Sequence, residues 1–221
     1  MADPHHLSPP ARRAGSAGEE PHAAARRRLA RAAAELARRS GPGALTVAAV
    51  AQASESTPAE VAEAFGDLKA CLRFAALEGH RLSTAPLREV APGDWRERLA
   101  AAIGAYYRAI AAEPALAALH LLDSGAALGL RPGDPGLAES VSAFAPFLAA
   151  AAAESGQAPL PAGVGDFLGW VIVSHAVREL RAGRAQSLPG EAAEVGAFVA
   201  LFYTSDEQRW GRREPTPGHG R

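Results

Sequence analysis

The stretch LTVAAVAQASESTPAEVAEAFGDLKACL, residues 45–72, contains the boundaries of two short helices separated by a tight turn. Thr46 can cap the first helix, because a threonine hydroxyl accepts a hydrogen bond from a free amide of the first helical turn. Val50 and Ala51 follow at the spacing of a buried helix face, and the pattern ends at about Ala53. The sequence therefore predicts a short helix before a turn at residues 54–56.

The second helix of this stretch has a strong start signal in Thr57-Pro58-Ala59-Glu60. Threonine at the N-cap and glutamate three residues later form a capping box, and proline suits the first helical position because its missing N–H is not needed there. Val61 and Phe65 lie one turn apart, and Gly66 ends the helix. Asp67 then opens a longer helix that reaches about Ser83.

A third helix precedes the stretch. From His22, Leu29, Ala33 and Leu36 recur at helical spacing between arginines, up to the breaker Gly41-Pro42-Gly43. Residues 1–21 are polar and rich in Pro and Gly, which predicts a flexible arm. Three short helices with a tight turn between the second and third are a DNA-reading arrangement.

The rest of the chain predicts a helical body. Aromatic residues make up only 6% of the 221 residues and alanine is abundant, so the chain has little material for a sheet. Segments bounded by Pro or Gly predict helices at about 95–112, 114–128, 136–154, 164–182 and 190–208, and the tail from Gly211 is polar. The fold class is therefore all-α, with a three-helix head joined to a larger bundle.

The spacing in residues 46–65 resembles that of TetR-family transcriptional regulators, which show T-x-x-x-I-A-x-x-A-G-V-S-x-x-x-x-Y-x-x-F. Without a gap, Thr46 falls on the family's Thr, Val50-Ala51 on its Ile-Ala, Ser54 on its Ala, Thr57 on its capping Ser and Phe65 on its Phe. Four positions depart: Glu55 replaces Gly, Ser56 replaces Val, Ala62 replaces an aromatic residue, and Leu68 replaces a phosphate-binding Lys beside Lys69.

The resemblance implies a helix-turn-helix DNA-binding domain at 22–66 and a ligand-binding and dimerisation domain at 67–210, between a flexible arm at 1–21 and a tail at 211–221. In the family the Thr and the capping Ser hold phosphates, and the start of helix 1 lies near the DNA backbone. The implied DNA-binding residues are Arg26, Arg27, Arg28, Thr46, Thr57, Pro58, Ala59, Glu60, Ala62, Glu63 and Lys69.

Charge leaves alternatives open at these positions. Residues 46–66 hold three glutamates and no Lys or Arg, about −3, whereas residues 22–45 hold six Arg against Glu35, about +5. Attraction between cationic side chains and phosphates normally supplies much of the affinity for DNA, so here the arginines of residues 22–45 would have to supply that attraction. They can equally form a solvated face. Glu60 and Glu63 can accept hydrogen bonds from cytosine N4 in the major groove. Alternatively, Glu60 is only the capping-box partner of Thr57, and Glu63 is only an exposed side chain.

The last two helical segments are apolar on more than one face, and the resemblance implies that they form a homodimer through four helices. A ligand pocket could be lined by the body's aromatic and histidine side chains, although core packing explains each of them equally well. These residues are Trp95, Tyr106, Tyr107, His120, Phe144, Phe147, Trp170 and His175.

Several other features of the sequence bear on function. His120 with Asp123 and His175 with Glu179 could share a metal, but two ligands without a third favour structural hydrogen bonds. Cys71, the single cysteine, cannot form an internal disulfide and is expected to be inert core. The N-terminus lacks a signal peptide's apolar core, and we expect no membrane span and a cytoplasmic protein. No enzyme motif or cofactor site is found.

The sequence thus predicts a dimeric regulator that binds a palindromic DNA operator and responds to a partly apolar small molecule, acting as a repressor that the small molecule releases. The alternative is a TetR-like module that binds small molecules or proteins and has lost operator recognition. The acidic stretch at 46–66 favours that alternative.

Overall fold

The computed structural model describes residues 19–123, 128, 130, 134–157, 160–161 and 163–204. These residues form helices and connecting turns without a strand, so the all-α prediction is confirmed. The helices are α1 (Glu19–Ser40), α2 (Val47–Ala53), α3 (Pro58–Phe65), α4 (Leu68–Thr84), α5 (Trp95–Ala112), α6 (Pro114–Leu122), α8 (Leu137–Ser142), α9 (Ala145–Glu154), α10 (Val164–Arg181) and α11 (Leu188–Ala200). Short 3-10 turns are η1 (Pro42–Ala44), η2 (Ala85–Glu89), η3 (Ala185–Ser187) and η4 (Leu201–Tyr203).

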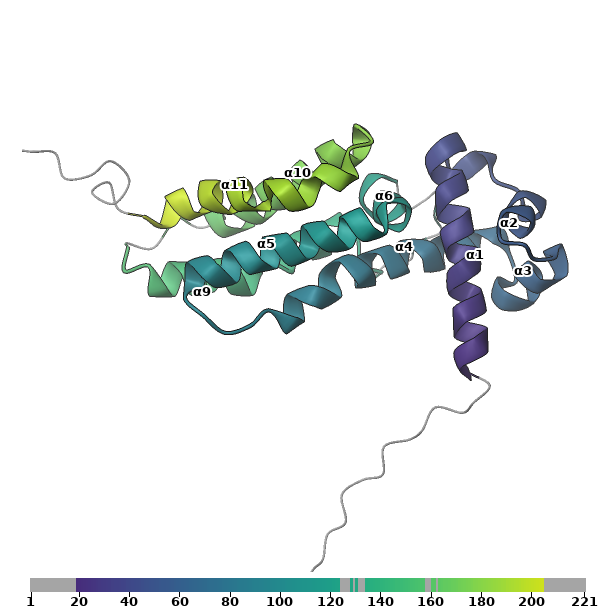
Figure 1. Ribbon diagram of the computed structural model, residues 1–221, viewed down its shortest axis with the longest axis horizontal. Coiled ribbons are helices and arrows are strands. Elements are labelled where there is room, and N and C mark those ends of the chain that lie inside the picture. The colour runs from purple at the N-terminus through teal and green to yellow at the C-terminus, as the bar shows by residue number, and fades with distance from the viewer. Residues whose placement is uncertain are drawn as a thin grey trace, which may run out of the picture.

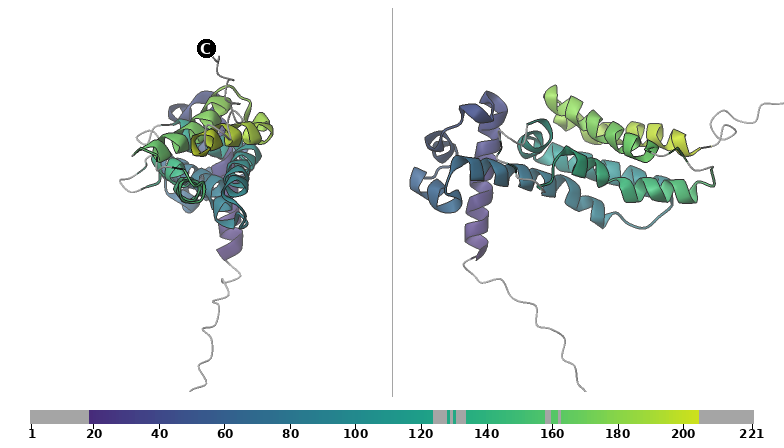
Figure 2. Two further views of the ribbon diagram at one scale, coloured as in Figure 1. Left: turned by 90° about the vertical axis from the view of Figure 1, so that its left-hand side faces the viewer. Right: turned by 180° about the vertical axis from the view of Figure 1, so that it is seen from behind.

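The described part of the chain is elongated, with a small head at one end and a layered body behind it (Figure 1). Helices α1, α2 and α3 form the head. Helix α4 leads from the head into the body, where it packs against α5 and α6, and α8 to α11 complete the body. Seen from behind, α1 stands across the junction of the two parts (Figure 2). The head therefore presents α2 and α3 at the far tip of the molecule.

The predicted caps of the head helices are present. Thr46 Oγ1 accepts a hydrogen bond from the Ala49 amide at 3.1 Å, and Asp67 caps α4 by accepting from the Ala70 amide at 2.7 Å. Thr57 and Glu60 form the predicted capping box at the start of α3. Gly66 ends α3 with a φ of +79°, a conformation that suits glycine.

Helix α1 begins at Glu19, three residues before the predicted start at His22. Pro21 is its third residue and had indicated a non-helical arm. A proline fits there because the amides of the first helical turn have no intrahelical partner, so its missing N–H removes no bond. Residues 1–18 of the predicted arm lie outside the described residues.

Two predicted body helices differ from the structure. The segment predicted at 136–154 is divided into α8 and α9 by a turn at Ala143 and Phe144. Pro146 explains the break, because a proline cannot donate to the ladder of a preceding helix and can only stand in the first turn of a new one. The helix predicted at 114–128 ends at Leu122, where α6 stops. The predicted tail at 211–221 and the end of the helix predicted at 190–208 lie outside the described residues.

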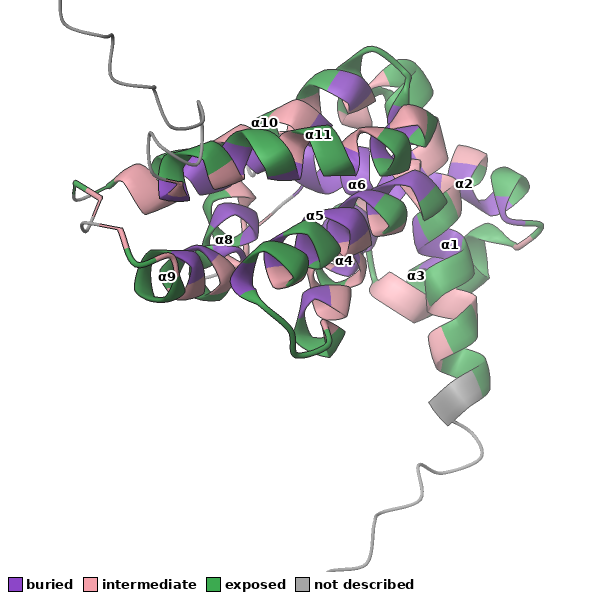
Figure 3. Cartoon of the chain, turned by 60° about the vertical axis from the view of Figure 1, so that its left-hand side comes forward, coloured by how far each residue is buried: buried purple, intermediate pink, exposed green. Residues whose placement is uncertain are grey.

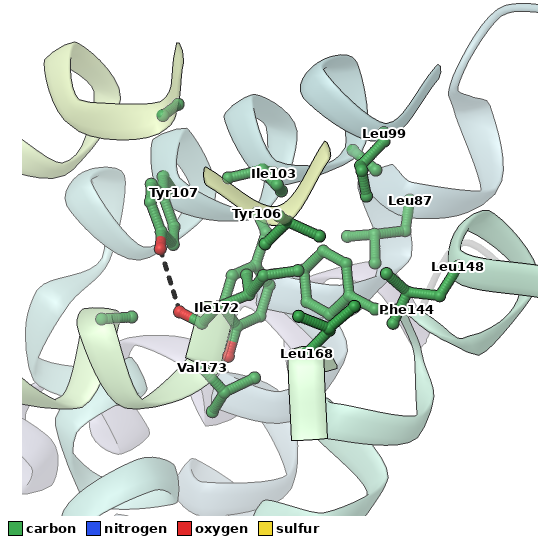
Figure 4. Packing of buried hydrophobic residues seen from close by; sticks show 14 of the residues in the cluster. Leu87, Leu99, Ile103, Tyr106, Tyr107, Phe144, Leu148, Leu168, Ile172 and Val173 are labelled. Carbon is green, nitrogen blue, oxygen red and sulfur yellow. Dashed lines mark hydrogen bonds between the residues drawn. The ribbon is translucent and has the colours of Figure 1, made fainter. Parts of the chain in front are cut away.

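Buried side chains form two clusters. Figure 3 marks the buried positions along each helix. The head cluster joins α1, α2, α3 and the first half of α4 to Ala115, Leu116 and Leu119 of α6 and to Leu128. The body cluster fills the space between α5, α9, α10 and α11, where Tyr106, Phe144 and Ile172 meet (Figure 4). Helix α6 supplies residues to both clusters, so the head and body share a continuous apolar interior.

Within the described ranges, one 18-residue window, Leu137–Glu154, has the length and apolar composition of a membrane span. In the fold this window is α8 and α9 with the turn between them, and Ser140, Val141 and Phe144 are buried against the body. Val141, Phe144, Leu148 and Ala151 of this window thus belong to the packing of the helical body, and 28% of the window is buried.

Candidate nucleic-acid interface and body cavities

The turn between α2 and α3 is held by backbone hydrogen bonds that reach back into α2. The Ser54 amide donates to the Val50 carbonyl at 3.0 Å, and the Ser56 amide donates to the Ala51 carbonyl at 2.8 Å. Glu55, between them, has a φ of +53° and is the only non-glycine residue with positive φ in the described part of the chain. This is the position at which the motif quoted above has Gly, and the backbone conformation explains that preference.

Helix α3 is anchored on one side and open on the other. Val61 is 1% exposed and packs in the head cluster, which fixes the rotation of the helix. The opposite face is exposed and carries five of the predicted DNA-binding residues, namely Pro58, Ala59, Glu60, Ala62 and Glu63. A helix anchored in this way presents one defined row of side chains to an external surface.

The two predicted threonines lie at the starts of α2 and α3 and are exposed. Thr57 Oγ1 accepts from the Glu60 amide at 3.2 Å, while Glu60 Oε2 accepts from the Thr57 amide at 2.6 Å. The hydrogen bonds that the Thr57 amide and the Thr57 hydroxyl donate to Glu60 Oε2 lower the pKa of this carboxyl. Glu60 is therefore held as a capping carboxylate, which is the simpler of its two predicted roles, and it remains exposed on α3.

The three predicted arginines of α1 have different surroundings. The Arg26 guanidinium lies over the rings of Phe65 and Phe74, at 4.9 and 4.5 Å from their centroids. Arg27 Nε is 3.4 Å from Glu78 Oε1, and Arg28 Nη2 donates to Ser56 Oγ at 3.1 Å. Arg26 thus ties α1 to α3 and α4, whereas Arg27 and Arg28 are exposed at the edge of the head.

The sequence did not identify the partners that hold α1 against the body. Arg31 forms an ion pair with Glu113 at 2.6 Å, at the start of α6, and Arg81 joins Arg27 in pairing with Glu78. Glu78 is largely buried, and hydrogen bonds from Arg81 lower the pKa of its carboxyl. Arg31 and Glu113, like Arg27 and Glu78, are far apart in sequence, so no local pattern could have indicated that they pair.

The predicted pocket residues do not enclose one cavity. Trp95, Tyr106, Tyr107 and Phe144 are buried in the body cluster, where the Tyr106 and Phe144 rings meet edge to face at 5.2 Å. Figure 4 shows this packing and the hydrogen bond that Tyr107 Oη donates to the Ile172 carbonyl at 2.9 Å. For these four residues the structure shows core packing.

The other four predicted pocket residues lie elsewhere. Trp170 is 41% exposed on the outer face of α10. His175 stacks on Tyr107 with ring centroids 5.7 Å apart and contacts Glu191. Phe147 is half-buried at a surface cavity, and His120 is buried close behind the same cavity.

That cavity has a volume of about 450 Å³ and lies between α4, η2, α8 and α9. We call it the body cavity; it is lined by His80, Thr84, Leu87, Arg88, Glu139, Ala143, Pro146 and Phe147. Its size is within the usual range of small-molecule sites. Arg88 and Glu139 place opposite charges at its edge, and Leu87 and Phe147 give it an apolar wall. Of its lining, the sequence analysis had identified Phe147 alone.

A polar cluster forms the inner side of the body cavity. His80 Nδ1 lies 3.3 Å from His120 Nε2, which lies 2.9 Å from Ser140 Oγ. Burial lowers the pKa of His80, and burial together with the neighbouring His80 lowers the pKa of His120 to about 4. Both rings are therefore neutral at pH 7 and act as hydrogen-bonding groups. Sequence reasoning missed His80 because a single polar residue on a helix gives no pattern.

No group of three metal-ligating side chains is found among the residues described. His120 contacts His80 and Ser140, not Asp123, and the Glu179 carboxylate is bonded to Arg178 and Arg184. Cys71 is buried in the head cluster, and burial raises the pKa of its thiol to about 12. His120 and His175 thus bond to partners other than Asp123 and Glu179, and Cys71 is a core residue, as the sequence indicated.

Large apolar side chains are exposed on α10, α11 and η4, and we call this set the outer apolar face. It consists of Phe167, Trp170, Phe198, Leu201 and Phe202, which are 37 to 58% exposed. The Phe198 and Phe202 rings contact each other edge to face at 5.7 Å. Large exposed apolar side chains on neighbouring helices are typical of a surface that meets another protein.

Comparison with solved structures identifies the fold. A bacterial regulatory protein of the TetR family from Rhodococcus RHA1 is similar, with a TM-score of 0.65, 19% identity, and coverage of 81% of this chain and 97% of that protein. The TetR-family transcriptional regulator PfmR from Thermus thermophilus is similar with a TM-score of 0.62, 16% identity, and coverage of 79% and 97%. No family model and no curated protein matches the sequence.

Proposed function

We propose that this chain, which has the fold of TetR-family regulators, is a cytoplasmic, dimeric DNA-binding transcriptional regulator that responds to a small molecule and acts as a repressor. The observation that carries the proposal is the head. Its α3 is anchored by Val61, capped by Thr57 and exposed along the opposite face. Such a helix can enter a major groove while α2 crosses the backbone.

Phosphate contacts would come from the edges of the head. Thr46 and Thr57 are exposed at helix starts, and hydroxyl groups and free amides in these positions bind phosphate oxygens well. Arg27, Arg28 and Lys69 are exposed cations that can offset the three glutamates of residues 46–66. Base reading would fall to the outer face of α3, where Glu63 has no capping role and can accept from cytosine N4.

Dimerisation would occur through the outer apolar face on α10 and α11. Phe167, the most exposed of its residues at 58%, and Phe198 would be covered by the same face of a second copy, since twofold interfaces use one patch twice. Two heads on one dimer would then meet a palindromic operator, with half-sites one helical turn or a multiple apart.

Ligand response would begin at the body cavity. His80 lies on α4, whose first half packs in the head cluster through Cys71, Leu72 and Ala75. A partly apolar molecule against Phe147 and His80 could shift α4 and change the spacing of the two heads. A coupling of about 1 to 3 kcal/mol is typical for such effects.

The first test is selection of bound fragments from genomic DNA by the purified protein, followed by a salt titration on the best fragment. A palindromic site whose affinity falls as salt rises is expected. Thr57→Ala should weaken operator binding, and Thr57→Ser, which keeps the cap, should restore it. Thr204→Ala at the far end of the body serves as the matched control.

The charge of α2 and α3 favours a second candidate function, that of a small-molecule or protein-binding module without operator recognition. Its support is the charge of residues 46–66, which contain three glutamates and no Lys or Arg. Retention of genomic fragments no better than of random DNA, by a folded dimer, would contradict the regulator and favour this module. Tight, salt-sensitive binding to one palindrome would exclude it.

A further inference from the structure

A second cavity lies at the junction of head and body, on the other side of α6 from the body cavity, and we call it the junction cavity. It has a volume of about 510 Å³ and is bounded by α1, α6, the end of α10 and the following turn to η3. In Figure 1 the last turns of α1 and the connection between α10 and α11 approach each other above α6. The junction cavity thus has one wall in the head and the others in the body.

The floor of the junction cavity is apolar. Ala118 and Leu122 of α6 and Leu180 of α10 line it, with Pro114 at one end. Ala118 is buried, whereas Leu122 and Leu180 are half-buried and therefore present apolar surface to the cavity. An apolar group of a ligand would remove this surface from water, which stabilises binding in proportion to the area covered.

Arginines from the two parts of the molecule lie at the edge of this floor. Arg38 comes from α1 and Arg181 from the last turn of α10, and both are exposed. Glu35 is the single acidic residue of the lining, so the cavity carries a net charge of about +1. Arg38 and Arg39 both pair with Glu35, at 3.2 and 3.9 Å, so Glu35 keeps one partner when Arg38 turns to a ligand.

Arg181 differs from the neighbouring Arg178 and Arg184, which both pair with Glu179. The nearby buried carboxylate of Glu179 is already bonded to Arg178 at 2.9 Å and to Arg184 at 2.7 Å. In the described part of the chain, no carboxylate lies within ion-pair distance of Arg181. The guanidinium is therefore available to an external anion, for which its planar fork is well suited.

We propose that the junction cavity is a second ligand site that takes a small amphipathic carboxylate. The anionic group lies between Arg38 and Arg181, and the apolar part lies on Ala118, Leu122 and Leu180. Because Arg38 belongs to the head and Arg181 to the body, one bound carboxylate ties the two parts together. Its effect on operator affinity rests on the proposed function, whereas its binding to the cavity does not.

The test uses decanoate as the probe and decanol as its uncharged counterpart, titrated calorimetrically into the full chain without DNA. Decanoate is expected to bind with saturation and decanol at least about 25-fold more weakly, because charge-assisted hydrogen bonds to two arginines are lost. Arg181→Gln and Arg38→Gln should each weaken decanoate binding about fivefold to tenfold. Both residues are exposed, so neither variant should impair folding.

Arg88→Gln distinguishes the two cavities, because it removes the same charge from the edge of the body cavity. The matched control is Arg108→Gln, which removes an exposed arginine of α5 that lines neither cavity. Both variants should leave decanoate affinity within about twofold of the parent. Loss of binding in Arg88→Gln but not in Arg181→Gln would move the carboxylate to the body cavity and overturn the proposal. Equal affinity for decanoate and decanol, or no binding, would also overturn it.

DNA measurements separate this proposal from the proposed function. Decanoate binding by a protein that retains no operator would contradict the regulator and leave the junction cavity as a ligand site. Operator binding without decanoate binding would overturn the junction site alone. Where both occur, decanoate should change operator affinity by the same factor by which the operator changes decanoate affinity.

Discussion

The head and the body of this molecule are filled by different side chains. Among the described residues, eight of the sixteen buried members of the head cluster are alanine and none is aromatic. The 22 buried members of the body cluster include five aromatic residues and only five alanines. The head is therefore held by close approach of helix backbones, and the body by large side chains that fill wider spaces. The head should be most sensitive to added volume and the body to removed volume.

Removal of volume from the body should have the largest effect. Phe144 is fully buried, and its ring meets Tyr106 edge to face. Phe144→Ala should lower the free energy of unfolding by about 4 kcal/mol, because it removes buried apolar surface and leaves a cavity. Urea denaturation followed by circular dichroism measures this change. Phe198→Ala, at a residue 49% exposed, should change it by less than about 0.5 kcal/mol in the monomer. A similar loss in both variants would contradict the description of the body core.

The second largest loss of stability is expected where a side chain is added between α4 and α6, at the junction of the head and body clusters. Gly79 of α4 faces α6 so closely that a methyl group there would overlap the carbonyl oxygen of Leu116 and lie 2.8 Å from its carbon. Gly79→Ala must push two helix backbones apart, and we expect it to cost about 3 kcal/mol, near the upper range for overpacking.

The control for this prediction is Gly104→Ala in the body helix α5. A methyl group at Gly104 would approach only the flexible end of Arg108, at 3.0 Å. Since alanine is the better helix former, Gly104→Ala should be neutral or stabilise by up to about 1 kcal/mol. If both alanines were tolerated equally, the close approach of α4 and α6 would not be what holds the head.

Acid should weaken the polar cluster that lies between the two cores. Burial lowers the pKa of His120 to about 4 in the folded chain, against 6.5 for a free histidine, so the unfolded chain binds the proton more tightly. Stability from this group is thus present above pH 6.5 and is lost as the pH falls toward 4. Between pH 6.5 and 4.5 the loss should be about 2 kcal/mol.

His120→Gln isolates this effect, because glutamine can bond to Ser140 but does not titrate in this range. The difference in unfolding free energy between the parent and the variant, measured across pH 4.5 to 7, should therefore shrink as the pH falls. A constant difference would show that His120 is not protonated on unfolding, and that other groups carry any acid sensitivity.

The sequence predicted the head better than the body, and the reason is the range of the interactions. The cap of Thr57 with Glu60 and the buried Val61 depend on residues within one turn, so their spacing identifies them. Leu128, in contrast, is buried in the head cluster although it follows α6. No local pattern relates it to α1 or α4, because that contact is created only when the body folds against the head.

The candidate sites show the same limit. Aromatic residues such as Tyr106 and Phe144 were identified, but residue type alone does not separate core packing from the wall of a cavity. Arg88 and Arg181, which are among the charged residues that line the two cavities, belong to no local motif and gave no signal. Their significance comes from the apolar surface that the fold places beside them.

The smallest expected change in stability is at the turn between α2 and α3, where backbone conformation and not side-chain packing determines the effect of a substitution. Glu55 has a φ of +53°, a conformation that a side chain disfavours by about 1 kcal/mol or more and glycine does not. Glycine also gains freedom in the unfolded chain, so the net stabilisation by Glu55→Gly should be only about 0.5 kcal/mol. Glu55→Ala separates strain from charge, since it removes the carboxylate but keeps Cβ and should not stabilise. Thermal unfolding of both variants decides the point. If alanine stabilised the chain as much as glycine does, the Glu55 carboxylate and not the backbone conformation would be the source of the destabilisation.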